Sequence, residues 1–234
     1  MSSGISGRLA DVRARIDAAA RAAGRLPSSV RLIAVSKTFP LAAIREAAAA
    51  GQAEFGENKV QEGLQKITES TDLSLRWHLL GHLQSNKAKR AAAAFHCIHS
   101  VDSLDILRRL DEGAEAAGRR PELLIQVDLA GEASKFGVPP DEVPRLLDSA
   151  ANLRAARLVG LMTLPPAAET PEQARPWFRR LRELRDAWVA NGTPAASLSE
   201  LSMGMSGDFE VAIQEGATIV RVGTAIFGSR YVQP

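Results

Sequence analysis

The sequence contains almost no cysteine. Of its 234 residues only Cys97 carries a thiol. A single cysteine cannot form a disulfide within the chain, so the fold is not stabilised by disulfides, and the composition fits a reducing compartment.

The chain also lacks a strong charge of either sign and any long apolar run. Its formal net charge is +2, which predicts neither a basic nucleic-acid surface nor an acidic tail. No window reaches the roughly 18 uninterrupted apolar residues of a membrane span. Residues 1–17 carry charges throughout, unlike a signal peptide. We therefore expect a soluble cytoplasmic protein that contacts neither nucleic acid nor membrane.

Predicted strands and helices alternate along the chain, and 45% of the residues are hydrophobic, enough for one substantial core. The expected strands lie within residues 31–36, 53–55, 75–81, 95–101, 122–130, 156–164, 197–207 and 218–223. They read as continuous apolar runs, which is typical of parallel strands covered on both faces. Alternation of this kind predicts a single α/β domain over 1–234, a (β/α)8 barrel at about 31–230. A doubly wound open sheet is the second choice.

An additional helix is expected before the barrel, at about residues 5–24. Apolar residues there recur at steps of three and four, on one helical face. These residues are Ile5, Leu9, Val12 and Ile16.

A lysine ends the first predicted strand, in "RLIAVSKTFP". Ile33, Val35 and Lys37 share one face by the period of two in a strand. In a barrel, active sites lie at the carboxyl ends of the strands. If this face points inward, burial favours the neutral amine, which is the nucleophile that forms Schiff bases. The alternative is a lysine that merely extends into water.

Two glycine-containing loops follow the last two predicted strands. Gly207 and Ser206 lie in "LSMGMSGDFE", and Gly223 and Thr224 lie in "VRVGTAIFG". Their free backbone N–H groups and hydroxyls suit a phosphate, and barrels frequently bind phosphate after strands seven and eight. The alternative is a helix cap, which Ser206 can provide, and an ordinary turn. Beside a strand-end lysine, these loops indicate a phosphorylated carbonyl compound.

Arg221 interrupts an otherwise apolar strand. A buried guanidinium requires a partner, and it can only donate hydrogen bonds. If it faces a pyridine ring, it leaves the ring nitrogen unprotonated and makes pyridoxal phosphate a poorer electron sink. An ion pair with Asp128 is the alternative.

Two histidines and a second lysine are further candidates for the site. His78 and His82 have a zinc spacing only if helical, and the β-rich segment around them argues against that, so no metal site is expected. His78 is more plausibly near the barrel mouth or satisfied at a strand end. Lys135 follows the fifth strand and is interpreted either as a loop lysine or as a second lysine for cofactor capture.

The sequence resembles the YggS/PROSC family of pyridoxal-phosphate-binding homeostasis proteins, which is related to the N-terminal barrel of alanine racemase. The matching segments span residues 32–230 in order: "LIAVSKTFP", "FGENKVQE", "WHLLGHLQSNK", "SKFG", "LSMGMSGDFEVAIQEG" and "VRVGTAIFGSR".

The resemblance implies that pyridoxal 5'-phosphate is bound, with Lys37 forming the Schiff base. It also implies cofactor contacts from Ser206, Gly207, Gly223 and Thr224 to the phosphate, from Met203 to the ring, from Arg221 to the ring nitrogen and from Asn58 at the edge. Asn58 could equally begin a helix as a capping box with Gln61. Lys59 departs from the tyrosine of the family pattern.

These features predict a carrier and buffer that maintains pyridoxal phosphate levels and supplies apo-enzymes, with little or no turnover. A racemase working on both faces of the cofactor needs a second base, and we expect Tyr231, in the tail, to be a packing or rim residue instead. The alternatives are a pyridoxal-phosphate-dependent amino-acid racemase or decarboxylase, and a class I aldolase that uses Lys37 without a cofactor.

Overall fold

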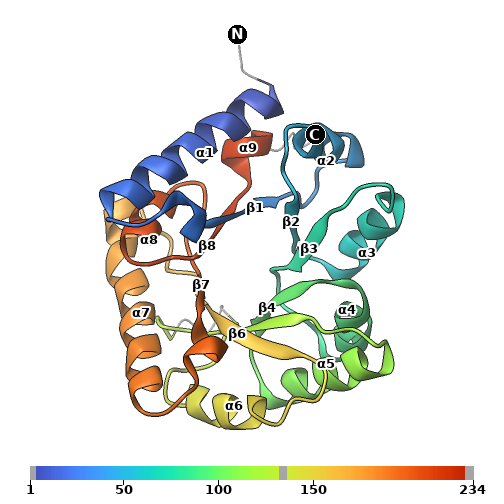
Figure 1. Cartoon of the computed structure of the whole chain (residues 1–234), viewed down its shortest axis with the longest axis vertical. Coiled ribbons are helices and arrows are strands. Elements are labelled where there is room, and N and C mark those ends of the chain that lie inside the picture. The colour runs from blue at the N-terminus through green and yellow to red at the C-terminus, as the bar shows by residue number, and fades with distance from the viewer. Residues whose placement is uncertain (1–3, 132–135, 230–234) are drawn as a thin grey trace.

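The computed structural model describes residues 4–131 and 136–229. Its eight strands form a closed parallel barrel in sequence order, with β1 paired to both β2 and β8. Helices surround the ring of strands (Figure 1). The predicted (β/α)8 barrel is confirmed, and the open doubly wound sheet is not formed.

The strands are β1 (Arg31–Val35), β2 (Glu54–Glu57), β3 (Arg76–Leu79), β4 (Cys97–Val101), β5 (Glu122–Gln126), β6 (Arg157–Met162), β7 (Glu200–Ser202) and β8 (Ile219–Val222). The helices are α1 (Ile5–Ala22), α2 (Leu41–Ala49), α3 (Val60–Glu69), α4 (Ala88–Ala94), α5 (Leu104–Ala116), α6 (Val143–Ala150), α7 (Arg175–Ala190), α8 (Phe209–Gln214) and α9 (Thr224–Phe227).

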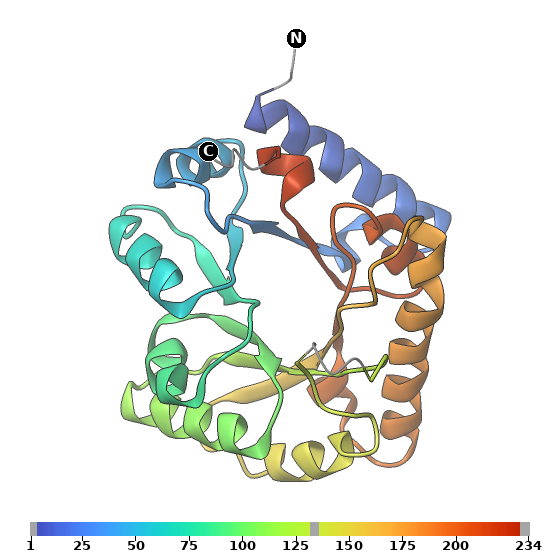
Figure 2. The same cartoon turned by 180° about the vertical axis from the view of Figure 1, so that it is seen from behind.

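The extra helix α1 precedes the barrel as expected. Its apolar stripe of Ile5, Leu9, Val12 and Ile16 is buried. The helix lies beside α8 and α9, which joins the start of the chain to the last βα units (Figures 1 and 2). It ends two residues earlier than predicted because Gly24 takes a positive φ of 69°, which glycine adopts without strain.

The period of two along each strand divides the core into two parts. Alternate residues from several strands meet inside the barrel, where they form a small cluster of Ile33, Val35, Leu80, Cys97, Leu124, Val159, Met162 and Ile219. The residues between them point outward and pack under the helices; Ala34, Val220 and Val222 are examples. This alternation decides which side chains can reach a site inside the barrel mouth.

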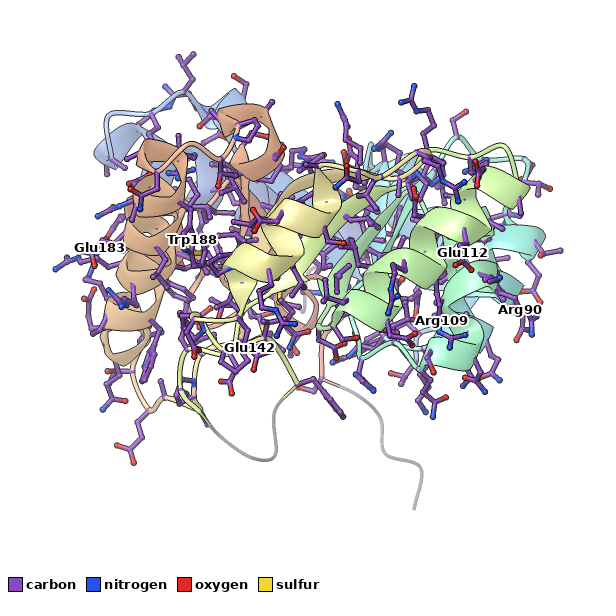
Figure 3. All side chains as sticks on the ribbon, turned by 90° about the horizontal axis from the view of Figure 1, so that it is seen from below. Arg90, Arg109, Glu112, Glu142, Glu183 and Trp188 are labelled. Atoms are coloured by element: carbon purple, nitrogen blue, oxygen red, sulfur yellow. The ribbon has the colours of Figure 1, made fainter. Side chains whose placement is uncertain are left out.

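The outer surface of the helices is charged. Arg90, Arg109, Glu112 and Glu183 are exposed there, and the stick view shows them at the periphery (Figure 3). Lys89 on α4, in the basic segment of residues 86–90, pairs with Glu112 on α5 at 3.0 Å, so this part of the segment belongs to a solvated helix face. Within the described residues, no helix combines the length and the apolar character that crossing a membrane requires.

Candidate cofactor-binding site

A cavity of about 550 Å³ opens at the carboxyl ends of the strands. Its lining comes from β1 and β8 and from the loops after β2, β3, β6 and β7: Val35, Lys37, Asn58, Leu80, Leu164, Pro165, Ala167, Met205, Ser206, Gly207, Arg221, Gly223 and Thr224. The volume lies in the range of sites for small ligands, and the position is the functional end of such barrels.

Lys37 enters the cavity from the end of β1. Ile33 and Val35 belong to the cluster inside the barrel, so the strand face that they share with Lys37 points inward, which meets the condition set for a site lysine. Lys37 itself is half-buried and lines the cavity. A primary amine is therefore present where a carbonyl group could reach it.

A buried polar network holds the backbone on the amino side of Lys37. Lys66 Nζ on α3 donates to the Ser36 carbonyl oxygen at 2.9 Å and to Glu57 Oε1 at 2.7 Å. Ser36 Oγ donates to the same Glu57 oxygen at 2.7 Å. Burial raises the pKa of Glu57, and the Lys66 ammonium is the charge that offsets it.

The backbone on the other side of Lys37 is strained. Thr38 has φ of 69°, in the left-handed region that a β-branched residue rarely adopts. Its N–H donates to Glu62 Oε1 at 2.6 Å, and Lys66 Nζ reaches the same oxygen at 2.8 Å. Conformations of this kind cost about 1–3 kcal/mol and concentrate at functional sites. The network therefore fixes the direction in which Lys37 leaves the strand.

The two predicted phosphate loops meet through a serine. Ser206 Oγ accepts hydrogen bonds from the N–H groups of Gly223 at 3.2 Å and Ala225 at 3.3 Å. It does not cap α8, where Asp208 is the N-cap residue. A Cβ added to Gly207 would meet no atom within 4 Å, so the backbone of that loop is open to the cavity. Hydroxyls and backbone donors of this kind suit a phosphate.

Arg221 is buried in β8 and is held by two acceptors. Its Nη1 donates to Ser202 Oγ at 2.6 Å, and its Nη2 donates to the Thr163 carbonyl oxygen at 2.9 Å. The ion pair with Asp128 is not formed; Asp128 Oδ1 instead accepts from the N–H groups of its own loop. Burial lowers the pKa of Arg221 to about 10, which leaves it protonated at neutral pH.

Met203 is not among the residues that line the cavity, and its contact with the ring stays a prediction. It is fully buried in the layer between barrel and helices. The physical reason is the strand alternation, because Ser202 points into the barrel and its neighbour must point out. Met205, 40% exposed, lines the cavity instead.

His78 also lies away from the cavity, although it points into the barrel. Its ring nitrogens contact Glu54 Oε2 at 2.9 Å and His99 Nε2 at 3.0 Å, and Glu54 begins β2 at the opposite end. Leu80 is the residue near the end of β3 that reaches the cavity. Lys135 lies outside the described residues, as does Tyr231.

Asn58 lines the cavity and does not form the predicted capping box. The N-cap residue of α3 is Lys59, and Gln61 accepts a hydrogen bond from Lys87 instead. Gly81 packs against this segment so closely that an added Cβ would lie 2.2 Å from the Asn58 carbonyl oxygen. This contact holds Asn58 at the rim.

Two parts of the site, the apolar wall of the cavity and the network under Lys37, are not apparent from the sequence. The wall consists of Leu80, Leu164, Pro165, Ala167 and Met205. Pro165 and Ala167 follow β6 in a loop whose course no periodicity indicates. The network carried a weak signal, since Glu62 and Lys66 have the four-residue spacing of a helical ion pair.

A second cavity of about 610 Å³ lies at the other end of the barrel. It is lined by Arg76, Phe95, His96, Arg119, Arg120, Pro121, Glu122 and Arg157. Glu122 pairs with Arg157 at 2.7 Å and with Arg76 at 3.6 Å, so the positive charge of the arginines that line this cavity is partly neutralised. That end of a barrel contributes to stability, and we assign the site to the mouth.

The sequence pattern of the family described as "Alanine racemase, N-terminal domain" matches residues 8–231. A pyridoxal phosphate homeostasis protein from Pseudomonas aeruginosa is 49% identical over 97% of this chain and 96% of its own length. The chain therefore belongs to the alanine racemase N-terminal domain family and, within it, to the pyridoxal phosphate homeostasis proteins. The predicted family is confirmed.

Solved structures of similar proteins agree with this family assignment. PipY from Synechococcus elongatus PCC7942, solved without pyridoxal phosphate, is 46% identical with a TM-score of 0.85 over 96% of this chain and all of its own. The same protein with pyridoxal phosphate bound gives a TM-score of 0.81 at 45% identity, again over 96% and 100% of the two chains. An alanine racemase from Streptomyces coelicolor shares the fold at 20% identity, with a TM-score of 0.67 over 95% of this chain and 59% of its own.

Proposed function

We propose that this protein binds pyridoxal phosphate in the mouth cavity, attached covalently to Lys37, and supplies it to apo-enzymes in the cytoplasm. The observation that carries the proposal is the set of groups that this one cavity brings together. An amine lies at the end of β1, phosphate donors follow β7 and β8, and a guanidinium lies in β8. Each of these groups matches one part of an anionic aldehyde with an aromatic nitrogen.

The chemistry of the lining fits this cofactor. Ser206, Gly207 and Thr224 would hold the phosphate, and Arg221 would donate to the ring nitrogen. The apolar wall, which includes Leu80 and Leu164, suits the faces of an aromatic ring. No aspartate or glutamate is among the described residues that line the cavity, so no lining carboxylate repels an anion.

Storage and delivery fit the site better than turnover. When bound, pyridoxal phosphate supplies an aldehyde for covalent attachment and a ring that draws electrons from it. Arg221 can only donate a hydrogen bond, so the ring nitrogen that it faces would be the unprotonated acceptor, and this keeps the ring a weak electron sink. Among the described lining residues the titratable side chains are Lys37 and Arg221, so Lys37 is the base that this lining offers. Proton transfer on both faces of a bound amino acid requires two bases.

Attachment is the first test. Wild-type protein incubated with pyridoxal phosphate should gain visible absorbance, and borohydride reduction should fix the cofactor on the peptide that contains Lys37. Lys37→Ala should lose most of this signal, whereas Lys59→Ala, which removes an exposed lysine nearby, should keep it. A wild-type protein that takes up no cofactor from an excess would contradict the proposal and leave the aldolase reading open.

Turnover separates the carrier from a racemase or decarboxylase. The loaded protein should neither change the chirality of D- or L-amino acids nor release carbon dioxide, yet should restore activity to an apo-enzyme that needs pyridoxal phosphate. Loss of a catalytic base typically lowers rates by about 10²–10⁴-fold, so a carrier should fall far below enzyme-like rates. Many turnovers per protein at such rates would favour the enzyme.

A further inference from the structure

A series of polar contacts crosses the inside of the barrel from Arg221 to Glu54. Arg221 Nη1 lies 2.6 Å from Ser202 Oγ, and that oxygen lies 2.9 Å from His99 Nδ1. His99 Nε2 lies 3.0 Å from His78 Nδ1, and His78 Nε2 lies 2.9 Å from Glu54 Oε2. Arg221, Ser202 and both histidines are buried, and they lie on four different strands.

The last contact, between His78 Nε2 and Glu54 Oε2, is close at 2.9 Å but does not meet the geometric requirements of a hydrogen bond. Neither of these two buried atoms has a hydrogen-bond partner among the described residues, so this polar contact is taken as the end of the series.

The chemistry of the two ends fixes the direction of every hydrogen bond. Arg221 can only donate hydrogen bonds, so Ser202 Oγ accepts one from it and donates its own O–H to His99 Nδ1. His99 must then carry its proton on Nε2 and donate to His78 Nδ1. By the same step His78 carries its proton on Nε2, which faces the Glu54 carboxylate, an acceptor only. Both histidines are neutral in this arrangement, and burial lowers the pKa of each, in agreement with it.

This series of contacts explains how a buried guanidinium is tolerated in β8. Among the described residues no carboxylate lies within ion-pair distance of Arg221, and its acceptors are a hydroxyl and a carbonyl. A hydroxyl that donates to a polarised histidine is a stronger acceptor, because neighbouring hydrogen bonds polarise one another at low dielectric. The Glu54 carboxylate, at the far end, orients the whole series.

We propose that Ser202, His99 and His78 are positioning residues that aim Arg221 at the ring nitrogen of the bound cofactor. The inference rests on the proposed binding of pyridoxal phosphate in the mouth cavity. With Nη1 and Nη2 each held by an acceptor, the guanidinium plane is fixed, and its remaining N–H groups face a defined direction. The series of contacts behind Arg221 thereby sets the strength of the hydrogen bond from Arg221 to the ring nitrogen.

The same region offers a competing interpretation as a metal site. Ligand atoms of His78, Cys97 and His99 lie within 4.8 Å of one another. A metal would occupy the facing nitrogens of the two histidines, which instead hydrogen-bond to each other. It would also require the Cys97 thiolate, and burial raises the pKa of that thiol. The two interpretations exclude each other, and the observed contacts favour the series from Arg221 to Glu54.

The test compares pyridoxal phosphate with its deaza analogue, in which a C–H group replaces the ring nitrogen. Equilibrium binding of both ligands is measured by absorbance titration. Wild type should prefer pyridoxal phosphate by about ten-fold, the effect of one hydrogen bond to a charged group. His99→Leu should reduce this preference several-fold toward equality. His99→Gln, whose amide both accepts and donates, and Cys97→Ala, which lies beside this series, should retain it.

The ratio of the two affinities isolates the ring nitrogen, since general damage to the site lowers both affinities together. Equal losses for the two ligands in His99→Leu would overturn the inference and leave the proposed function intact. If that variant does not fold, Ser202→Ala, with one oxygen atom fewer, provides the same comparison. Stoichiometric bound metal in the purified protein, lost in Cys97→Ala, would also overturn it. No uptake of pyridoxal phosphate by wild type would refute the proposed function itself.

Discussion

The two ends of the barrel both carry arginines, but they balance them differently. At the amino ends of the strands, Arg31 pairs with Glu200 at 3.1 Å and Arg157 with Glu122 at 2.7 Å. At the mouth, Arg221 is held by a hydroxyl and a carbonyl, without a carboxylate among the described residues lining the cavity. One end is an ion-pair network; the other presents donors to an anion.

The carboxylates near the mouth lie behind the site. Glu57 and Glu62 contact Lys66, Ser36 and Thr38, and they support the backbone on both sides of Lys37. Negative charge is thereby used for positioning and is kept off the cavity wall. The amino end of the barrel therefore stabilises the fold through many exchangeable contacts, while the mouth depends on a few buried ones.

The largest difference between the ends should follow from removing one cation at each. Lys66→Met leaves the fully buried Glu57 carboxylate without its ammonium, and breaking a buried pair in this way costs about 3–5 kcal/mol. Arg157→Ala removes a side chain that is 67% exposed, and such pairs contribute about 0–1 kcal/mol. The free energy of unfolding in urea measures both. Similar losses in the two variants would show that the ends do not differ as described.

Sequence patterns predicted the barrel and its mouth because period and loop chemistry are local. Lys37, Ser206 and Thr224 reach one cavity since each follows a strand, and parallel strands end together. The inward position of Arg221 follows from the same alternation.

Sequence patterns say less where a side chain depends on distant parts of the chain. Met203, which the resemblance places at the ring, is buried in the layer between barrel and helices and is not among the residues that line the cavity. Of the two expectations for His78, a place near the mouth or a satisfied side chain at a strand end, the contacts with Glu54 and His99 favour the second. The acceptors of Arg221 come from β7 and from the end of β6, so no local pattern could pair them.

A smaller effect is expected from the phosphate donors at the mouth. Thr224→Val removes one hydroxyl, and a hydrogen bond to a charged group contributes about 1.5–3 kcal/mol, which corresponds to about ten-fold or more in affinity for pyridoxal phosphate. Dephosphorylated pyridoxal should bind wild type weakly and lose little further in this variant. The control is Ser199→Ala. It removes a hydroxyl that contacts the Val159 carbonyl oxygen near the amino end of the barrel, and it should leave the affinity for pyridoxal phosphate unchanged. Equal binding of both ligands to wild type would argue against a phosphate site.

The smallest effect concerns pH and the region between the two ends. Burial lowers the pKa of His78 and His99 below the ordinary value of 6.5, which favours the neutral form of both rings in the folded protein. Below that value the unfolded chain takes up protons that the folded barrel excludes. The stability contributed by each neutral histidine is therefore present above about pH 6.5 and is lost as the pH falls toward the depressed folded value.

Each histidine should add up to about 1.4 kcal/mol per pH unit to this loss. His99→Gln keeps a donor and an acceptor but cannot titrate, so its unfolding free energy should fall less steeply than that of wild type between about pH 6 and pH 5. The charges that face the pair are those of Glu54, Arg31, Arg76 and Arg221, and all four remain in the variant. Urea unfolding at several pH values measures the slopes, and parallel curves for the two proteins would mean that His99 is not held neutral by burial.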